Sequence, residues 1–362
     1  MEVAPLLDLP EAPAPAGARP AWFAAPDGRR LRAVLFPATA PVRGSVVLSP
    51  GRTEPIEKYF ETIGELQGRG FVVLAHDWRG QGLSARLLPD RLKCHARSTD
   101  EFLDDYQRLL DTFEERAPKP WIMLGHSMGA ALNLATLVKG EIRIAGAFFT
   151  NPMLRVKTGR HSLWSVNFQT NWQVNHGRGT DYVPELFNDP FEDSFEEDAL
   201  THDAARYEVW HEQLFACPHL AVGSPTWGWL AFALKLGEGL LKEKALKKVK
   251  TPVTLLCSGD DNIVNKQPTK QFARKLGKGQ YVEIVGAEHE IHIEADDYRV
   301  QAMNELDTLL DHVAPRAGAG RADDADAGTD RGLVAASLGA FATGALDFDG
   351  GDDGEEEEPQ NF

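Results

Sequence analysis

The sequence predicts an α/β fold: a mostly parallel sheet with helices on both faces and an inserted helical cap. Short apolar runs alternate with segments of helical periodicity up to residue 150 and again from residue 251, as in parallel sheets. The alternation is interrupted between these residues, which is typical of an insertion. The apolar run Trp121–Leu124 leads into Gly125-His126-Ser127-Met128-Gly129 and a helix-favouring segment. This strand, tight turn and helix together resemble a nucleophile elbow, which presents a serine at the edge of such a sheet.

Individual elements follow from apolar spacing and turn residues. Two short strands are expected in residues 21–38, around the turn Pro26-Asp27-Gly28. The other expected strands are Ser45–Ser49, Phe71–His76, Trp121–Leu124, a run near Ile144–Phe149, Val253–Cys257 and Tyr281–Val285. The expected helices are Pro55–Gly68, Thr99–Glu115, Ala130–Lys139, Gln267–Leu276 and Asp296–His312.

These elements suggest a division of the chain into four parts. Residues 21–150 and 251–313 should form the core, with residues 151–250 as a cap over the carboxyl edge of the sheet. Residues 1–20 are rich in Pro and Ala and are expected to be a flexible arm. Residues 314–362 are rich in Ala, Gly and Asp and are expected to be a disordered acidic tail with an unknown partner.

Composition limits the classes of function. The formal net charge is −16, and the stretch from Pro315 onward, with three Arg against twelve Asp and Glu, accounts for −9 of it. The remaining −7 argues against nucleic acid as a partner. Three widely spaced cysteines indicate neither a disulfide framework nor a zinc site. We see no signal peptide and no apolar run long enough to span a membrane, so we expect a cytoplasmic protein.

Ser127 needs a base and an acid to become a nucleophile. Serine is weakly nucleophilic at its ordinary pKa and is activated by a histidine that a carboxylate orients. Behind this kind of elbow the chain order is Ser, acid, His, on loops after later strands. His289 follows the last predicted strand, and both Asp260 and Asp261 follow the one before it. Spacing alone leaves either aspartate as the acid.

An oxyanion hole needs two backbone N–H groups aimed at the developing charge. One candidate is the amide of Met128, and the other is the amide of Arg52, in the loop after the strand that ends at Ser49. The Arg52 side chain has two interpretations. It either pairs with Glu54 or Glu57, which we favour, or binds a phosphate or carboxylate of a substrate.

Other histidines near these motifs do not indicate a metal. His292 gives H-E-x-H with His289, which differs from the H-E-x-x-H of zinc peptidases. His76 and His126 are expected to pack around the site. We therefore expect no metal and no cofactor.

The cap is rich in aromatic residues. These rings either form the cap's own core or line an apolar pocket for an acyl chain, and Trp227, Trp229, Phe168 and Trp172 are our candidates for the second role. Residues 229–250 carry six lysines against two glutamates. Such a basic amphipathic stretch is either a solvated helix face or a contact with an anionic membrane surface.

Four motifs occur in one order: Ser49-Pro50-Gly51-Arg52, Asp77-Trp78-Arg79-Gly80-Gln81-Gly82-Leu83-Ser84, Gly125-His126-Ser127-Met128-Gly129 and Ala287-Glu288-His289-Glu290. Together they resemble the α/β-hydrolase branch that contains monoacylglycerol lipases and bacterial lysophospholipases. The resemblance covers about residues 21–313 and includes the cap segment Gly223-Ser224-Pro225-Thr226-Trp227, which is similar to the lysophospholipase-like members.

The resemblance implies an α/β-hydrolase fold and a cofactor-free serine hydrolase. It aligns residues 259–264 with G-x-D-x-x-V, which implies Asp261 as the acid, and it implies the amides of Arg52 and Met128 as the oxyanion hole. Single-chain lipids, lysophospholipid or monoglyceride, are the implied substrates. Lipase members usually carry His-Gly where this chain has Pro50-Gly51, which weakens monoglyceride specificity in particular. A broad small-ester carboxylesterase and a non-catalytic binding or scaffold protein are the alternatives.

Overall fold

The computed structural model describes residues 1–140, 142–186, 189–192, 194–195 and 200–316. Its centre is an eight-stranded sheet in the order β1-β2-β4-β3-β5-β6-β7-β8. The strands β1 to β8 are Arg19–Ala24, Arg30–Phe36, Gly44–Ser49, Phe71–His76, Trp121–His126, Gly146–Thr150, Val253–Ser258 and Gly279–Ile284. β1 and β2 form an antiparallel hairpin, β2 pairs antiparallel with β4, and all other pairs are parallel. The predicted α/β class is confirmed.

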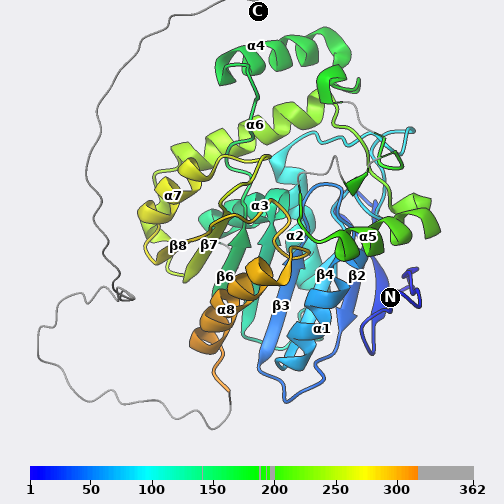
Figure 1. Cartoon of the computed structure of the whole chain (residues 1–362), viewed down its shortest axis with the longest axis vertical. Coiled ribbons are helices and arrows are strands. Elements are labelled where there is room, and N and C mark those ends of the chain that lie inside the picture. Colours follow the sequence, from blue (N-terminus) through cyan, green and yellow to red (C-terminus); the bar gives the residue numbers. More distant parts are fainter. Residues whose placement is uncertain (141, 187–188, 193, 196–199, 317–362) are drawn as a thin grey trace, which may run out of the picture. The chain divides into compact units, whose positions relative to one another are not determined.

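Helices cover both faces of the sheet (Figure 1). One face carries α1 (Phe60–Gly68) and α8 (Asp296–Val313), and the other carries α2 (Thr99–Phe113), α3 (Ser127–Lys139) and α7 (Lys266–Lys275). The central strands are apolar throughout because alternate side chains enter two separate cores. In β3, for example, Val47 packs on the α2–α3 side and Val46 packs on the α1–α8 side.

Most element boundaries lie within two residues of the sequence expectation. Two helices differ more. α3 begins at Ser127, three residues before the predicted start at Ala130, and the predicted helix Pro55–Gly68 begins as a 3-10 turn, η1 (Ile56–Tyr59), before α1. The Asp77 carboxylate accepts the Ile56 N–H at 3.1 Å. An N–H group at the start of a helical turn has no acceptor within the turn, and the Asp77 carboxylate supplies one.

Residues 1–20, expected to be a flexible arm, contact the core at several points. Val3 bridges to Ala21 in β1, and the Pro5 carbonyl accepts a hydrogen bond from the buried Arg32 guanidinium at 3.2 Å. Gln67 in α1 donates to the Ala16 carbonyl at 2.9 Å. A Pro- and Ala-rich segment shows no helical periodicity, but its backbone satisfies buried donors of the core, which the composition did not reveal.

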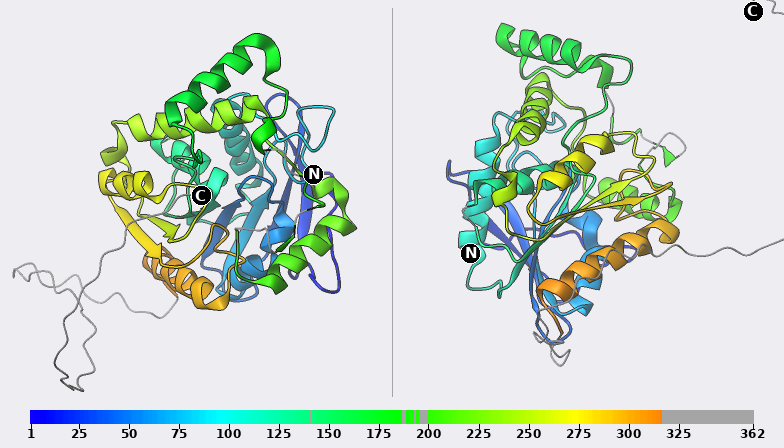
Figure 2. Two further views of the ribbon diagram at one scale, coloured as in Figure 1. Left: turned by 45° about the horizontal axis from the view of Figure 1, so that its top comes forward. Right: turned by 90° about the vertical axis from the view of Figure 1, so that its left-hand side faces the viewer.

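Residues 151–250 form the interrupting segment. Its helices are α4 (Leu163–Gln173), η2 (Val174–Arg178), η3 (Pro184–Leu186), α5 (Ala204–Ala216), η5 (Pro218–Leu220), α6 (Trp227–Lys242) and η6 (Leu246–Lys248). α6 packs on α3, and α4 lies over α6 on the side away from the sheet (Figure 2). The segment also contacts two loops that follow core strands. Arg52, after β3, donates to the Gly223 carbonyl. The Glu290 N–H, after β8, donates to the Leu200 carbonyl.

The basic stretch 229–250 does not present an apolar face to solvent. Leu230, Phe232, Leu234, Leu236 and Leu240 of α6 are buried within the protein. The six lysines of the stretch are exposed, so any membrane contact there would be electrostatic. No helix in the described part of the chain is both long and apolar enough to cross a bilayer. The predicted acidic tail lies outside the described residues from 317 onward.

Candidate active site

Ser127 lies at the junction of β5 and α3, in a tight turn that its neighbouring glycines permit. Its φ is +48°, in the left-handed region that non-glycine residues rarely adopt. A Cβ on Gly129 would lie 2.3 Å from the Ser49 carbonyl oxygen, and one on Gly125 would lie 3.1 Å from the Ala130 backbone. The turn thus brings the first residues of α3 against the end of β3 and places the serine hydroxyl where the two strands end.

Three side chains from separate loops form one hydrogen-bonded chain at this point. His289 Nε2 lies 3.1 Å from Ser127 Oγ, and His289 Nδ1 lies 2.7 Å from Asp261 Oδ2. All three side chains are buried. Their strands β5, β7 and β8 are parallel, so the loops after them meet at the same edge of the sheet.

Asp261, and not Asp260, contacts the histidine. Its second oxygen, Oδ1, accepts the backbone N–H groups of Ile263 at 2.7 Å and Val264 at 2.9 Å. Burial raises the pKa of this carboxyl, but the hydrogen bond and charge of His289 and the two N–H donors outweigh burial, and the pKa is lowered. Asp260 is exposed. The geometry therefore gives an ionised carboxylate that orients the imidazole.

The loop after β3 carries the proposed oxyanion amide of Arg52. Glu54 Oε2 accepts the Gly51 N–H at 2.5 Å, and Gln81 Oε1 accepts the Thr53 N–H at 2.8 Å. Trp78 Nε1 donates to the Pro50 carbonyl at 2.9 Å. The Asp77–Ser84 motif, expected to shape a turn near the site, thus holds this loop. No hydrogen bond within the described residues uses the Arg52 N–H.

Met128 is the first residue after Ser127 in α3. Backbone N–H groups in the first turn of a helix have no partner within the helix. The Met128 amide is therefore a second donor beside the serine.

Behind the serine lies a buried group that we call the Glu54 cluster, made of Glu54, His126 and His292. Glu54 Oε1 lies 3.4 Å from His292 Nε2 and 3.8 Å from His126 Nε2. Burial, with the neighbouring His289 as a lesser cause, lowers the pKa of His126 to about 3, and burial lowers that of His292 well below its ordinary value. Both rings are therefore neutral near pH 7.

The Glu54 cluster is the one set of described residues with potential metal-ligating atoms close together, all within 4.8 Å of one another. It also serves packing, since the His126 ring lies 4.8 Å from that of His289 and the His292 ring stacks on Tyr59. His76, buried with its pKa lowered to about 3 by burial, lies 3.1 Å from Ser49 Oγ. The sequence predicted a packing role for His76 and His126 but carried no sign of the Glu54 contact.

The loop that carries His289 is fixed from both sides. Asn151, which follows β6, donates through Nδ2 to the His289 carbonyl at 2.5 Å. On the cap side, the Glu290 N–H donates to the Leu200 carbonyl at 2.8 Å. Neither contact was expected from the sequence, because both join residues about a hundred or more positions apart.

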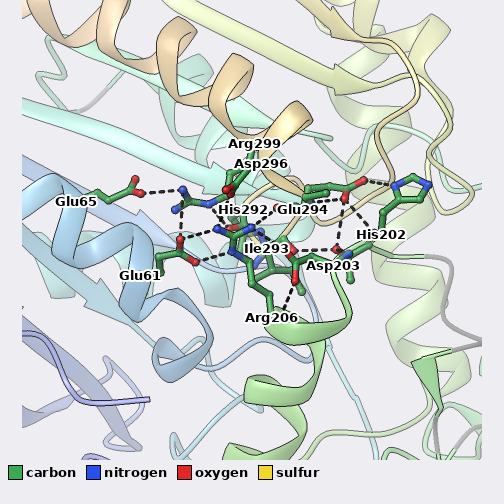
Figure 3. Close-up of polar contacts among 12 residues, drawn as sticks. Glu61, Glu65, His202, Asp203, Arg206, His292, Ile293, Glu294, Asp296 and Arg299 are labelled. Atoms are coloured by element: carbon green, nitrogen blue, oxygen red, sulfur yellow. Dashed lines mark hydrogen bonds and ion pairs between the residues drawn. The ribbon is translucent and has the colours of Figure 1, made fainter. Parts of the chain in front are cut away.

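A second part of this loop is bound to the start of α5 (Figure 3). The buried Glu294 carboxylate accepts the Glu288 N–H at 2.9 Å and lies 2.7 Å from His202 Nδ1. Arg206 donates to the Glu294 carbonyl and to both carboxylate oxygens of Glu61, each at 2.8 Å. The base-bearing loop and the cap are thus joined by charged contacts that also reach α1.

A cavity of about 340 Å³ lies between the cap and the core loops. Core residues Arg52, Thr53, Lys58, Ile263 and Glu290 line it. The cap contributes Leu186, Pro190, Ser194, Leu200, Tyr207, Trp210, His211, Leu214, Val222, Gly223 and Ser224. Four of the core residues, Arg52, Thr53, Ile263 and Glu290, belong to the loops of the site, so this cavity is the candidate binding space, although Ser127 and His289 do not themselves line it.

The aromatic residues that line this cavity differ from those selected in the sequence. Trp227 and Trp229 are buried in α6, and Phe168 and Trp172 are 63% and 45% exposed on α4. None of the four lines the cavity, and their role in substrate binding stays a prediction. The missed signal is a stripe on α5, in which Tyr207, Trp210, His211 and Leu214 recur at helical spacing.

Comparisons with known proteins identify the family and the fold. Residues 40–296 match the family described as serine aminopeptidase, S33. Lysophospholipase L2 of Escherichia coli K12 is 30% identical over 281 residues, covering 75% of this chain and 81% of the relative. Monoglyceride lipase of Homo sapiens is 22% identical over 299 residues, covering 81% and 90%. A solved structure, a soluble variant of monoglyceride lipase from Saccharomyces cerevisiae in complex with a substrate analog, matches with a TM-score of 0.65 at 20% identity. It covers 81% of this chain and 95% of that one, and shows the same fold.

Proposed function

The chain belongs to the serine aminopeptidase, S33, family of hydrolases, and we propose that it cleaves carboxylic esters of single-chain acyl lipids through an acyl-enzyme. Membership of this family confirms the branch that the motifs indicated. The observation that carries the proposal is the continuous chain from Ser127 Oγ through His289 to Asp261, with contacts of 3.1 and 2.7 Å.

The proposed reaction follows from the position of each group. Ser127 Oγ attacks the ester carbonyl while His289 Nε2 takes its proton, and Asp261 stabilises the imidazolium that forms. The carbonyl oxygen becomes an oxyanion, which the amides of Arg52 and Met128 stabilise. His289 then returns the proton to the leaving alcohol, and water releases the acyl group by the same sequence of transfers.

The proposed substrates are lysophospholipids or monoglycerides. The relatives at 30% and 22% identity bear the names lysophospholipase and monoglyceride lipase. The cavity of about 340 Å³ combines apolar cap residues such as Leu214 and Val222 with charged core residues such as Arg52. Such a lining suits a ligand with an apolar chain and a polar headgroup.

The first experiment tests whether the protein is a serine hydrolase. A fluorophosphonate probe should label the wild type and leave Ser127→Ala unlabelled. Turnover of an ester should fall by on the order of 10⁶ in that variant, because the three groups act as a unit. Equal labelling of both proteins would refute the mechanism, and unlabelled wild type would favour the scaffold alternative.

The second experiment tests the substrate class. We expect wild-type protein to hydrolyse long-chain lysophosphatidyl and monoacylglycerol esters faster than short-chain nitrophenyl esters. If only acyl groups of two to four carbons turn over, the small-ester carboxylesterase is the correct function.

We also propose a cytoplasmic location with electrostatic attraction to anionic bilayers through the exposed lysines of residues 229–250. Each lysine near such a surface contributes about 1 kcal/mol at moderate salt. The protein should sediment with vesicles that contain anionic lipid and should stay in solution with neutral vesicles. Equal behaviour with both vesicles, or binding that persists in high salt, would contradict this contact.

A further inference from the structure

Arg52 places a guanidinium group in the cavity between the core and the cap. Its backbone N–H is a proposed oxyanion donor, and its side chain lines the cavity between core and cap. A substrate whose ester carbonyl reaches that amide can place its alcohol portion in the cavity, near this cation. The question is whether the cation already has an anionic partner in the protein.

The two carboxylates nearest in sequence are used elsewhere, which corrects the expectation that one of them pairs with Arg52. Glu54 Oε2 accepts the Gly51 N–H and the Tyr59 hydroxyl, at 2.5 and 2.6 Å. Both oxygens of Glu57 accept from the Arg32 guanidinium at 2.6 Å. Both carboxylates are 1% exposed, and their hydrogen bonds direct them away from the cavity and into the core.

The contacts of the Arg52 side chain are with neutral groups. Nη1 donates to the Gly223 carbonyl at 3.1 Å, and the guanidinium carbon lies 5.4 Å from the centroid of the Trp229 ring. Burial raises the pKa of the nearby Cys94 thiol, so this group carries no negative charge that could pair with Arg52. No ion pair joins Arg52 to any residue in the described part of the chain.

The other charges of the cavity compensate one another. Lys58 Nζ lies 2.6 Å from Glu290 Oε2, and both side chains are buried. Arg52 therefore supplies the uncompensated positive charge among the described lining residues. Its position is held by Gly223 and Trp229, while the donors on Nη2 and Nε make no hydrogen bond with any described residue. A pre-positioned guanidinium with two adjacent donors matches the oxygens of a phosphate.

We propose that the Arg52 side chain binds the phosphate of the substrate headgroup and makes this enzyme selective for lysophospholipids over neutral monoacylglycerols. This inference rests on the proposed function, because it concerns the alcohol portion of the same ester. In a lysophospholipid one glycerol unit separates the ester from the phosphate. In a monoacylglycerol the corresponding position is a neutral hydroxyl, which a nearby cation stabilises much less than it stabilises a phosphate.

The test measures the ratio of kcat/KM for a lysophosphatidyl ester to kcat/KM for the monoacylglycerol with the same acyl chain. In Arg52→Gln the ratio should fall by on the order of 10- to 100-fold, because one charge-assisted contact is lost for one substrate alone. Any displacement of the oxyanion loop affects both substrates and cancels in the ratio. Arg52→Lys keeps the positive charge but loses the two adjacent N–H donors of the guanidinium. Its ratio should lie between those of the wild type and Arg52→Gln.

Arg86→Gln is the matched control. Arg86 Nη2 donates to the His219 and Ala221 carbonyls at 3.0 and 2.9 Å, close in sequence to Gly223, but Arg86 does not line the cavity. This control should leave the ratio unchanged. Inorganic phosphate should inhibit monoacylglycerol hydrolysis by wild-type protein more strongly than by Arg52→Gln. This measurement tests recognition of the phosphate group independently of the lipid.

The outcomes distinguish this inference from the proposed function. A wild type that hydrolyses both lipids, with a ratio that Arg52→Gln leaves unchanged, overturns the phosphate site and leaves the hydrolase intact. An equal fall in the ratio for Arg86→Gln would overturn the site as well. A wild type that hydrolyses no acyl lipid overturns the proposed function itself.

Discussion

Gly129→Ala tests how the elbow and the oxyanion loop fit together. The added Cβ would lie 2.3 Å from the Ser49 carbonyl oxygen and 2.4 Å from that of Pro50, whereas ordinary contact begins at 3.4 Å. Both obstructing atoms belong to the backbone, so no side-chain rotation relieves the overlap. The start of α3 and the loop after β3 must therefore separate by roughly 1 Å, the difference between these distances.

Two measurements follow from this displacement. Overpacking of this size destabilises a folded protein by about 1–3 kcal/mol, which urea unfolding detects. Separation of the two oxyanion donors should lower kcat by about 10²- to 10³-fold, the usual effect of losing one such donor. The activity loss should persist at temperatures where circular dichroism shows that the variant is folded.

Gly64→Ala and Gly239→Ala are matched controls, because an added Cβ at either helical position meets no atom within 4 Å. Each should leave activity unchanged and stabilise its helix by up to about 1 kcal/mol. Near wild-type activity in Gly129→Ala would refute the reasoning, because the two donors would then not depend on close contact between α3 and the β3 loop.

Three further predictions concern the acid, the cap contact and the Glu54 cluster. Asp261→Asn should lower kcat by about 10⁴-fold, while Asp260→Asn should retain most activity; the reverse order would reassign the acid. The Glu294 hydrogen bond raises the pKa of His202 above 6.5, so its stabilising contribution is complete below that pH and is lost as pH rises through the raised value. His202→Gln should therefore lower the melting temperature more at about pH 5.5 than at about pH 9, and a pH-independent difference would contradict this sign. Dialysis against a chelator should leave ester hydrolysis unchanged, because no proposed proton transfer passes through the Glu54 cluster; a loss that zinc restores would show a metal there.

The strands and the elbow were accessible from sequence because their signals are local. β4 spans Phe71–His76 as predicted, since a continuous apolar run between polar turns specifies a strand buried on both faces. To recognise the elbow in the sequence, only a predicted strand, two glycines at fixed spacing and a predicted helix were needed. Loops after parallel strands meet at one edge of the sheet. The positions of Ser127, the aspartate pair and His289 after three such strands were therefore enough to predict that they lie close together.

Non-local contacts were not accessible in this way. The composition of residues 1–20 predicted a loose arm, but their carbonyls accept hydrogen bonds from Arg32 and Gln67 of the core. Similarly, an aromatic residue in the cap packs inside it or lines a cavity depending on how α4, α5 and α6 lie against one another. The composition of the cap is the same whether a given ring packs inside the cap or lines the cavity. Composition therefore could not show which rings line the cavity, and the four that we selected do not.

The sequence by itself determined the fold class and the family, and it predicted the serine and the histidine of the proposed site, because these depend on short patterns and on chain order. Spacing alone left two candidates for the acid, and the resemblance implied Asp261; the tertiary structure shows that the Asp261 side chain is the one that contacts the imidazole. It also decided the environment of Arg52. Glu54 and Glu57 are near it in sequence, but their hydrogen bonds with Tyr59 and Arg32 direct both carboxylates into the core. The guanidinium is left in the cavity, where a substrate would meet it.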